Sequence, residues 1–399
     1  MSVPMPARPA APVPPAAEFE VPGITPLFTP NRSFYVTDTA LTAPRVDRDR
    51  WRLRVRGLVE RELEFSVQEL LEMELVEVDA TLVCVHNPVG GDRISSARWL
   101  GVPLGTLLGT AGVHPESDHV LTHSLTGFTA GLPLEMVGEG PTPLVALGMN
   151  DEPLTIRNGF PARLLTPGIW GADASTKCLA TIELTTWANA TDYWDARGWP
   201  RVPGAVKPGS RIDVPADRST VASGPAIAAG IAWAPRRGVS GVEVAIDGGP
   251  WQSARLSPHI APTLWRQWAL TWQAEPGEHQ LQVRTLSGDE VQEENPAPPY
   301  PQGSSGYHTI RAQVPDNGAQ PPRWRPRLAH TRADLTGRLR LAANAPPAWR
   351  RHGYPPPTGL RRPVASRTAR PATAPTEPAL TPAGCSNVER LGSGLWVVC

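Results

Sequence analysis

TLVCVHNPVGGDRISSARWLGVPL, residues 81–104, places one cysteine where an apolar run opens into a glycine-containing loop. The run VDATLVCV, 78–85, predicts a strand that ends near Cys84. Gly90 and Gly91, a few residues later, would let the backbone approach a large ligand closely. A lone cysteine with apolar flanks is most often a small core residue, but a thiolate is also a preferred ligand of soft transition metals. The residues of this stretch leave both interpretations open.

Strands and short helices alternate around this stretch without a regular βαβ period, which predicts the α+β class. WRLRVRGLV (51–59) alternates apolar residues with arginines, as a half-buried strand does. SVQELLEME (66–74) predicts a helix with Ser66 as its N-cap and Glu69 completing a capping box. A second helix is expected over 102–113, ending at Gly112. Further strands and loops are expected at 119–127, 143–150, 162–171 and 180–187.

The sequence changes character after residue 203. Residues 203–235 are rich in proline, alanine and glycine and predict a connector. GVEVAIDGGPWQSARL (241–256) contains a strong hairpin signal, Asp-Gly-Gly after an alternating strand. A second alternating pair, 265–272 and 279–286, surrounds EPGE, and 307–314 predicts a last strand. Short strands with tight turns predict an immunoglobulin-like sandwich of about 100 residues.

Charge is distributed unevenly along the 399 residues. Basic and acidic residues number 38 each, but residues 321–399 hold 13 arginines and three acidic residues, so the preceding part is acidic overall. An acidic body is not expected to bind nucleic acid. The segment 317–399 predicts a disordered Arg/Pro-rich tail, or a basic arm for an anionic surface. Residues 1–20 predict a disordered Pro/Ala-rich leader.

The sequence contains no apolar window long enough to span a membrane and no secretory signal pattern. We therefore expect a cytoplasmic protein as the chain stands, and a membrane or extracytoplasmic one if a segment precedes it. The four cysteines, Cys84, Cys178, Cys385 and Cys399, form no CxxC pair and no zinc-type spacing.

A second stretch with chemical potential is NGFPARLLTPGIWGADASTK, residues 158–177. It gathers Asn158, Arg163, Ser175 and Lys177 among glycines and prolines. A guanidinium, an ammonium and neighbouring backbone N–H groups are what a phosphate or an extended heterocycle needs. An exposed loop with solvated charges is the alternative for this pattern.

Taken together, five stretches resemble the sulfite oxidase family of molybdopterin enzymes, and more narrowly its haem-free actinobacterial branch. They are TPNRSFYVTDT (29–39), TLVCVHNPVGG (81–91), ARWLGVPL (97–104), MNDEPLTIRNGFPARLLTPGIWG (149–171) and STK (175–177). The resemblance implies a molybdopterin-binding oxidoreductase domain over residues 21–205. It also implies an immunoglobulin-like dimerisation domain over residues 206–316.

The resemblance implies that Cys84 ligates molybdenum and that the cofactor is Mo-molybdopterin without haem. His86, directly after the metal-ligand region, is a second catalytic candidate, and equally a candidate for a structural hydrogen bond. The residues implied to hold the pterin and its phosphate are Asn31, Phe34, Tyr35, Asn158, Arg163, Ser175, Thr176 and Lys177.

The implied activity is a two-electron oxygen-atom transfer on a small sulfur oxyanion, with a separate electron carrier and a homodimer as expected partners. The sequence departs from the family pattern in two places. Thr37-Asp38-Thr39 stands where eukaryotic sulfite oxidases carry Arg-Asn-His, and Phe128 stands where a tyrosine is common. These changes make sulfoxide reduction a rival activity. The alternative to an enzyme is a degenerate, cofactor-free scaffold that serves as a binding or dimerisation module.

Overall fold

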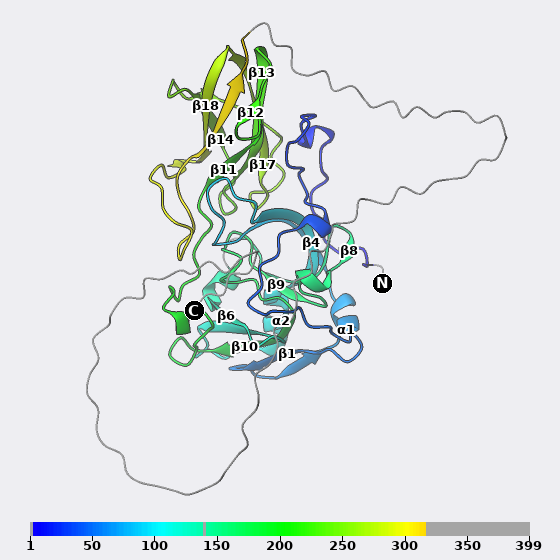
Figure 1. The fold of residues 1–399 in the computed structure, drawn as a ribbon. Helices are drawn as coiled ribbons and strands as arrows, with labels where there is room; N and C mark the ends of the chain where they lie inside the picture. The colour runs from blue at the N-terminus through cyan, green and yellow to red at the C-terminus, as the bar shows by residue number, and fades with distance from the viewer. Residues whose placement is uncertain (1–2, 139–140, 317–399) are drawn as a thin grey trace, which may run out of the picture. The chain divides into compact units, whose positions relative to one another are not determined.

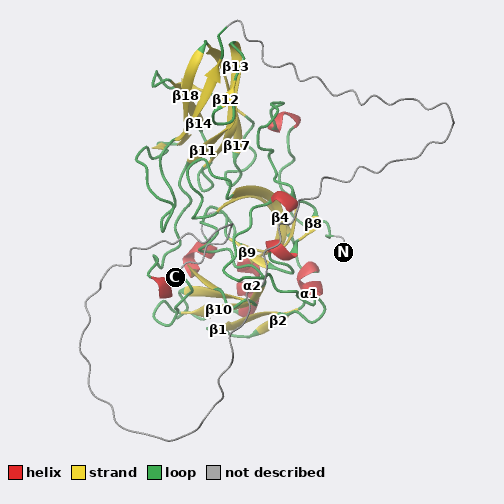
Figure 2. Ribbon diagram, in the orientation of Figure 1, coloured by secondary structure: helices red, strands yellow, loops and turns green. Residues whose placement is uncertain are grey.

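The computed structural model describes residues 3–138 and 141–316; the expected tail, 317–399, lies outside the described residues. The described part is rich in sheet and has two α-helices, α1 (Val67–Leu71) and α2 (Leu104–Ala111) (Figure 1, Figure 2). The α+β class therefore fits only loosely. No helix in these ranges is long and apolar enough to cross a membrane.

The first half of the chain forms two sheets. One has the strand order β2-β1-β10-β5-β6. Its strands are β1 (Leu53–Gly57), β2 (Leu63–Phe65), β5 (His119–Ser124), β6 (Thr129–Pro133) and β10 (Leu179–Thr185). The other has the order β3-β4-β7-β8, with β9 also paired to β7. Its strands are β3 (Val76–Val83), β4 (Ile94–Pro103), β7 (Leu144–Met149), β8 (Glu152–Pro153) and β9 (Arg163–Leu165).

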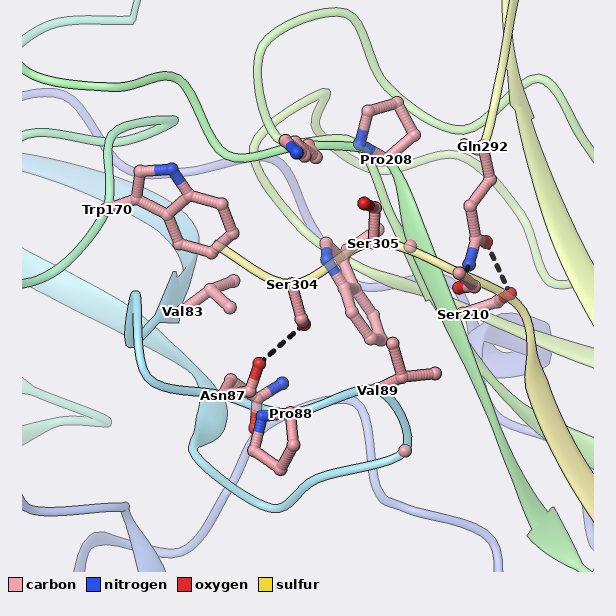
Figure 3. Close-up of a pocket in the computed structure, with 15 residues that line it drawn as sticks. Val83, Asn87, Pro88, Val89, Trp170, Pro208, Ser210, Gln292, Ser304 and Ser305 are labelled. Carbon is pink, nitrogen blue, oxygen red and sulfur yellow. Dashed lines mark hydrogen bonds between the residues drawn. The ribbon is translucent and has the colours of Figure 1, made fainter. Parts of the chain in front are cut away.

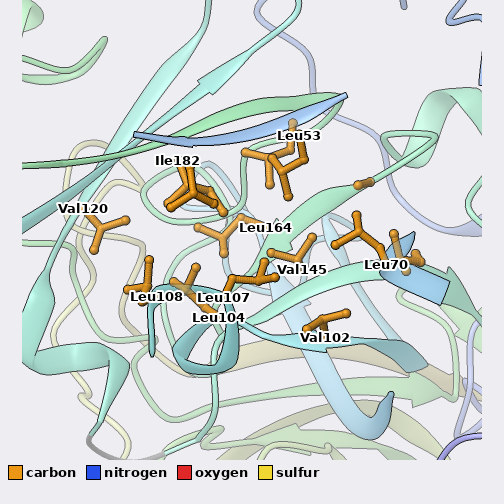
Figure 4. Close-up of a cluster of buried hydrophobic side chains, with 14 of the residues drawn as sticks. Leu53, Leu70, Val102, Leu104, Leu107, Leu108, Val120, Val145, Leu164 and Ile182 are labelled. Atoms are coloured by element: carbon orange, nitrogen blue, oxygen red, sulfur yellow. The ribbon is translucent and has the colours of Figure 1, made fainter. Parts of the chain in front are cut away.

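One apolar core joins these two sheets and both helices (Figure 4). Leu104 and Leu107 of α2 are fully buried against residues such as Leu53 of β1 and Val145 of β7. Burial of each large aliphatic side chain contributes about 1.5–3 kcal/mol. The core therefore fixes the β3–β4 sheet, whose edge carries Cys84.

Local sequence signals set the ends of both helices. The side chain of Ser66 accepts a hydrogen bond from Glu69 N, and Glu69 returns one to Ser66 N, which completes the predicted capping box of α1. Helix α2 ends before Gly112, whose φ of +71° most residues avoid. Both helices were predicted from these residues.

The second half forms a two-sheet β-sandwich. One sheet has the order β11-β13-β17-β16, with β11 (Gly209–Val214), β13 (Gly224–Trp233), β16 (Arg255–Leu256) and β17 (Arg266–Ala274). The other has the order β12-β20-β18-β14-β15, with β19 also on β18. Its strands are β12 (Ser219–Thr220), β14 (Gly241–Ile246), β15 (Gln252–Ser253), β18 (Gly277–Ser287), β19 (Glu290–Val291) and β20 (His308–Val314). Buried residues of both sheets share one core.

Two predictions for this region are wrong. The expected connector, 203–235, instead contains β11, β12 and β13, and β13 pairs with both β11 and β17. The sequence of β13 does not predict a strand, because alanine and glycine have low strand propensity. The runs around EPGE do not pair with each other: β17 and β18 belong to different sheets. The hairpin over 241–256 is confirmed by the pairing of β14 with β15.

Short 3₁₀ turns complete the described chain: η1 (Pro15–Ala17), η2 (Asn31–Ser33), η3 (Leu134–Val137), η4 (Ile156–Asn158) and η5 (Asp195–Arg197). Residues 3–20 differ from the expected disordered leader, because residues 7–10 lie along β3 and Phe19 N donates to Gln267 of β17. Ala7 N donates to Leu75 O, Glu77 N donates to Arg8 O, and Arg8 forms an ion pair with Glu74.

Candidate active site

Cys84 is the first residue after β3, as the sequence predicted, and only 2% of its surface is exposed. Its N–H donates to Arg93 O at 3.0 Å, and its carbonyl accepts from Asn87 N at 2.9 Å. The first bond extends the β3–β4 ladder by one residue, and the second closes a turn. The thiol is therefore held at the strand end by backbone on both sides.

The neighbours of the Cys84 thiol are polar. Thr37 Oγ1 donates to Sγ at 3.7 Å, and His86 Nδ1 lies 4.0 Å away. Burial raises the pKa of Cys84, while the His86 N–H, the Thr37 hydroxyl and the charge of Arg93 oppose this shift. Without a bound metal the sulfur is a neutral thiol at neutral pH. A metal would deprotonate it, and the N–H and O–H donors would remain as partners for the thiolate.

Arg163 begins β9 and is buried, with 5% of its surface exposed. Its Nη1 donates to Asn158 O at 3.3 Å and its guanidinium lies 5.3 Å from the centre of the Trp99 ring, but Nε has no partner among the described residues. Burial lowers the pKa of Arg163 to about 10. Arg163 is thus a buried cation with a free donor.

Three other predicted residues lie around the same segment. Asn158 ends η4 and is buried. The Ser175 hydroxyl is buried without a hydrogen-bond partner among the described residues. The Thr176 hydroxyl instead bonds Thr122 Oγ1 at 2.7 Å, so its side chain is already used within the fold.

Lys177 is engaged by an acidic neighbour. Its Nζ forms an ion pair with Asp38 and donates to Thr37 O at 2.9 Å. Burial lowers the pKa of Lys177, and Asp38 opposes that shift. The predicted phosphate-binding ammonium therefore already has a carboxylate partner.

The segment 31–37 brings Tyr35 to this site and leaves Asn31 at its margin. Burial raises the pKa of Tyr35, the Cys84 charge adds to this effect, and the Arg163 charge opposes it. Phe34 is buried and stacks on Tyr35, with ring centres 5.7 Å apart. The Asn31 side chain binds Met149 O and Glu152, and only its carbonyl reaches Asn158 Nδ2, at 3.5 Å.

His86 lies against aromatic rings. Its ring centre is 5.9 Å from that of Trp199 and 6.1 Å from that of Tyr300, and Trp199 Nε1 donates to Tyr300 Oη at 2.9 Å. Burial lowers the pKa of His86, and the charge of Arg93 adds to the shift. The imidazole is therefore neutral at neutral pH.

Several residues near the site were not predicted from the sequence. They are Thr37, Asp173, Trp199 and Tyr300. Burial raises the pKa of Asp173 to about 7, and one carboxylate oxygen accepts from Gly204 N at 3.0 Å. Gly171, two residues earlier, donates its N–H to Val83 O, next to Cys84. Only the closeness of Thr37 and Asp173 to predicted motifs was a usable signal.

The donors fit an anionic group beside a soft metal. A buried polar group without a partner costs about 1–3 kcal/mol, and more when it is charged. Phosphate oxygens would give Arg163 Nε and Ser175 Oγ the acceptors that the described protein does not supply. The described residues include no group of three or more His, Cys, Asp or Glu side chains suited to a metal. A site here would thus use Cys84 as its protein ligand, with the cofactor supplying others.

The chain is similar to several known proteins. The oxidoreductase molybdopterin-binding domain family matches residues 40–194. Mitochondrial sulfite oxidase of Rattus norvegicus is 30% identical over 339 residues, which is 72% of this chain and 61% of the relative. The chain thus spans less than two thirds of that relative. The uncharacterized oxidoreductase YuiH of Bacillus subtilis (strain 168) is 32% identical over 42% of this chain and 81% of its own length.

A solved structure supports the fold. The sulfane dehydrogenase SoxCD from Paracoccus pantotrophus superposes with a TM-score of 0.64 at 21% identity, covering 73% of this chain and 82% of its own. The family match includes Cys84, Asn158, Arg163, Ser175 and Lys177. The chain belongs to the sulfite oxidase family of molybdopterin-binding oxidoreductases.

Proposed function

We propose that this protein is a molybdenum–molybdopterin enzyme that transfers an oxygen atom to or from a small sulfur compound. The observation that carries the proposal is the Cys84 thiol at a strand end, together with two buried donors, Arg163 Nε and Ser175 Oγ, that have no partner among the described residues. When bound, the molybdenum–pterin group supplies two-electron oxygen-atom transfer, and the protein supplies binding, orientation and electrostatics.

Each residue of the site has a distinct part in this proposal. Cys84 ligates the metal, and the Thr37 hydroxyl and His86 N–H stabilise its thiolate. Arg163 and Ser175 bind the cofactor phosphate, with Asn158 orienting the guanidinium through its carbonyl. Tyr35 and Phe34 line the pterin, and Lys177 contributes positive charge moderated by Asp38. Asn31 supports this arrangement through its carbonyl, which accepts from Asn158 Nδ2, and Thr176 supports it through its hydrogen bond to Thr122.

A small sulfur oxyanion is the first candidate substrate. Its oxidation adds one oxygen atom from water and releases two protons and two electrons, which a separate carrier accepts. Arg93, whose charge acts on the Cys84 thiol, and Lys177 supply positive charge that would attract an anion. Haem is not expected within this chain.

A sulfoxide is the second candidate, and one observation favours it. The Asp38 carboxylate neutralises Lys177, and Asp173 adds a further acidic group close enough to raise the pKa of Cys84. Acidic groups weaken the attraction of an anion and leave a neutral sulfoxide unaffected. Reduction of a sulfoxide consumes two protons and two electrons and releases water.

A cofactor-free scaffold is less well supported. Burying Arg163 Nε and the Ser175 hydroxyl without hydrogen-bond partners among the described residues is unfavourable unless a ligand offsets the cost. We propose, further, that residues 21–205 form the cofactor domain and that residues 206–316 form an immunoglobulin-like domain able to pair with a second copy.

The test is a substrate panel on the metal-loaded chain with an artificial electron mediator. The panel contains sulfite, methyl sulfoxides and chlorate, and Asp38→Asn is assayed beside the unmodified protein. Turnover of any of these with stoichiometric molybdenum supports oxygen-atom transfer. Turnover of sulfite well above that of the sulfoxide, with a lower KM for sulfite in Asp38→Asn, identifies the oxyanion as substrate. Turnover of the sulfoxide well above that of sulfite, with a KM that Asp38→Asn leaves unchanged, identifies the neutral substrate. A metal-loaded protein that turns over none of them contradicts the proposal.

A further inference from the structure

The loop that follows Cys84 is held from the β-sandwich, a region more than a hundred residues away in the sequence. Ser304 Oγ donates to Asn87 O at 2.7 Å, as Figure 3 shows. Arg211 Nη1 donates to Gly91 O at 2.8 Å. Gly90, with φ at +73°, packs so closely on the ring of His308 that a Cβ would lie 2.2 Å from its Cδ2.

Hydrogen bonds within the loop connect these contacts to Cys84. Asn87 N donates to Cys84 O at 2.9 Å, and Arg93 N donates to Asn87 Oδ1 at 2.8 Å. Arg93 O in turn accepts from Cys84 N at 3.0 Å. Asn87 is therefore bonded to the backbone of Cys84 on one side and held by Ser304 on the other.

The loop and the sandwich are not packed against each other along their whole shared face. A small cavity lies between Asn87–Gly90 of the loop and Ser304–Gly306 of the sandwich, and Trp170 and Trp233 also line it (Figure 3). Since the loop is not packed on this side along its whole length, its position depends on the directional contacts of Ser304 and Arg211 together with the packing of Gly90 on His308.

The same region of the sandwich also holds His86. Tyr300 precedes Ser304 by four residues, and its ring lies nearly parallel to the imidazole, at an interplanar angle of 21°. Its hydroxyl is fixed by Trp199 Nε1 at 2.9 Å. The side chain next to the thiol is thus oriented by a residue from outside the cofactor domain.

We propose that the β-sandwich is a working part of the cofactor site, in which Ser304, Arg211 and Tyr300 position the loop that carries Cys84 and His86. This inference rests on the proposed binding of molybdenum by Cys84. These three are positioning residues, because they act through the loop. Residues that orient metal ligands in this way typically change metal affinity or activity by about 10- to 100-fold when they are replaced.

The experiment uses the full chain produced in a host that makes molybdopterin, with Ser304→Ala and Tyr300→Phe as the test variants. Ser253→Ala and Tyr307→Phe are the matched controls: Ser253 is exposed on β15, and Tyr307 packs on Trp251. The readouts are the Mo(V) electron paramagnetic resonance spectrum, molybdenum content and thermal midpoint. We expect altered g-values and a loss of about tenfold in kcat for the test variants, with thermal midpoints only a few degrees below those of the controls.

A metal-free readout separates this inference from the proposed function. Cys84 alkylation by iodoacetamide in the metal-free chain is followed by mass spectrometry, with buried Cys178 as internal reference. Losing the Ser304 bond should accelerate alkylation of Cys84 about fivefold, since a typical hydrogen bond restrains opening by that factor. If the unmodified chain never binds molybdenum, the proposed function fails. The alkylation rate of Cys84 in the metal-free chain still tests whether Ser304 positions the loop. Spectra and alkylation rates of the test variants equal to those of the controls would overturn the inference.

Discussion

Replacing the buried cation Arg163 by methionine should separate stability from cofactor binding. Methionine keeps much of the length and volume of the side chain and removes the charge. Arg163 has no carboxylate partner in the described protein, and its Nε is unpartnered. In the cofactor-free chain the charge therefore destabilises the fold, whereas in the loaded chain the proposed cofactor phosphate would pair with it.

The size of the effect follows from the surroundings of Arg163. Burial lowers its pKa to about 10, and a shift of this size corresponds to about 3 kcal/mol of unfavourable free energy for the charged form. The contact with the Trp99 ring at 5.3 Å and the hydrogen bond to the Asn158 carbonyl at 3.3 Å each stabilise the charged form by about 1 kcal/mol. Arg163→Met should therefore make the cofactor-free chain more stable by about 1 kcal/mol.

The assay is urea unfolding of the metal-free chain together with molybdenum analysis of the chain produced with cofactor. Arg98→Met is the matched control. Arg98 donates to both oxygens of Asp79, at 2.8 and 2.9 Å, and Asp79 is 3% exposed. Removing Arg98 leaves that carboxylate buried and unpaired, so the control should lose about 3–5 kcal/mol and keep its molybdenum.

The two variants should thus move in opposite directions. Arg163→Met gains stability without cofactor and loses molybdenum, and Arg98→Met does the reverse. An Arg163→Met protein that retains full molybdenum, or that is destabilised as strongly as Arg98→Met, would refute the reasoning.

Two further predictions concern pH and the Cys84 loop. Burial raises the pKa of Asp173 to about 7, so the folded chain binds more protons than the unfolded one between about pH 4 and 7 and loses stability as pH rises through that range. Asp173→Asn should remove up to about 3 kcal/mol of this loss between pH 5 and pH 8, measured as unfolding free energies at the two pH values. Equal pH dependence in both proteins would contradict this prediction. Gly90→Ala should lower stability by about 2 kcal/mol or more, because the left-handed backbone and the His308 ring both oppose a Cβ. Gly288 has a φ of +60° and open space around it, so Gly288→Ala should show only the backbone cost in the same denaturation assay. Equal losses of unfolding free energy at the two glycines would exclude the clash with His308.

Elements with local signals were predictable from the sequence. The capping box of Ser66 and Glu69 and the Gly112 stop fixed both helices, and the Asp-Gly turn fixed the β14–β15 hairpin. Strand β13 was missed because GPAIAAGIAW is built of small residues, and only its pairing with β11 and β17 makes it a strand. Hydrogen-bonded partners outside the segment are invisible to periodicity.

The same distinction applies to the site. Cys84 and Arg163 lie in motifs that the sequence displays, and the structure brings Thr37, Tyr35 and Lys177 to the same region. Ser304 lies 217 residues from Asn87, its hydrogen-bond partner, and no spacing rule connects the two. A contact between segments so far apart in the sequence therefore required the three-dimensional structure.

The most direct test is molybdenum X-ray absorption of the purified full chain and of Cys84→Ser. We predict a metal-loaded protein in which the substitution removes one sulfur from the metal's coordination shell or abolishes metal retention, while the thermal midpoint of the metal-free chain changes little. Identical sulfur coordination in both proteins, or a chain that never acquires molybdenum in a competent host, would contradict the assignment of Cys84 as the metal ligand.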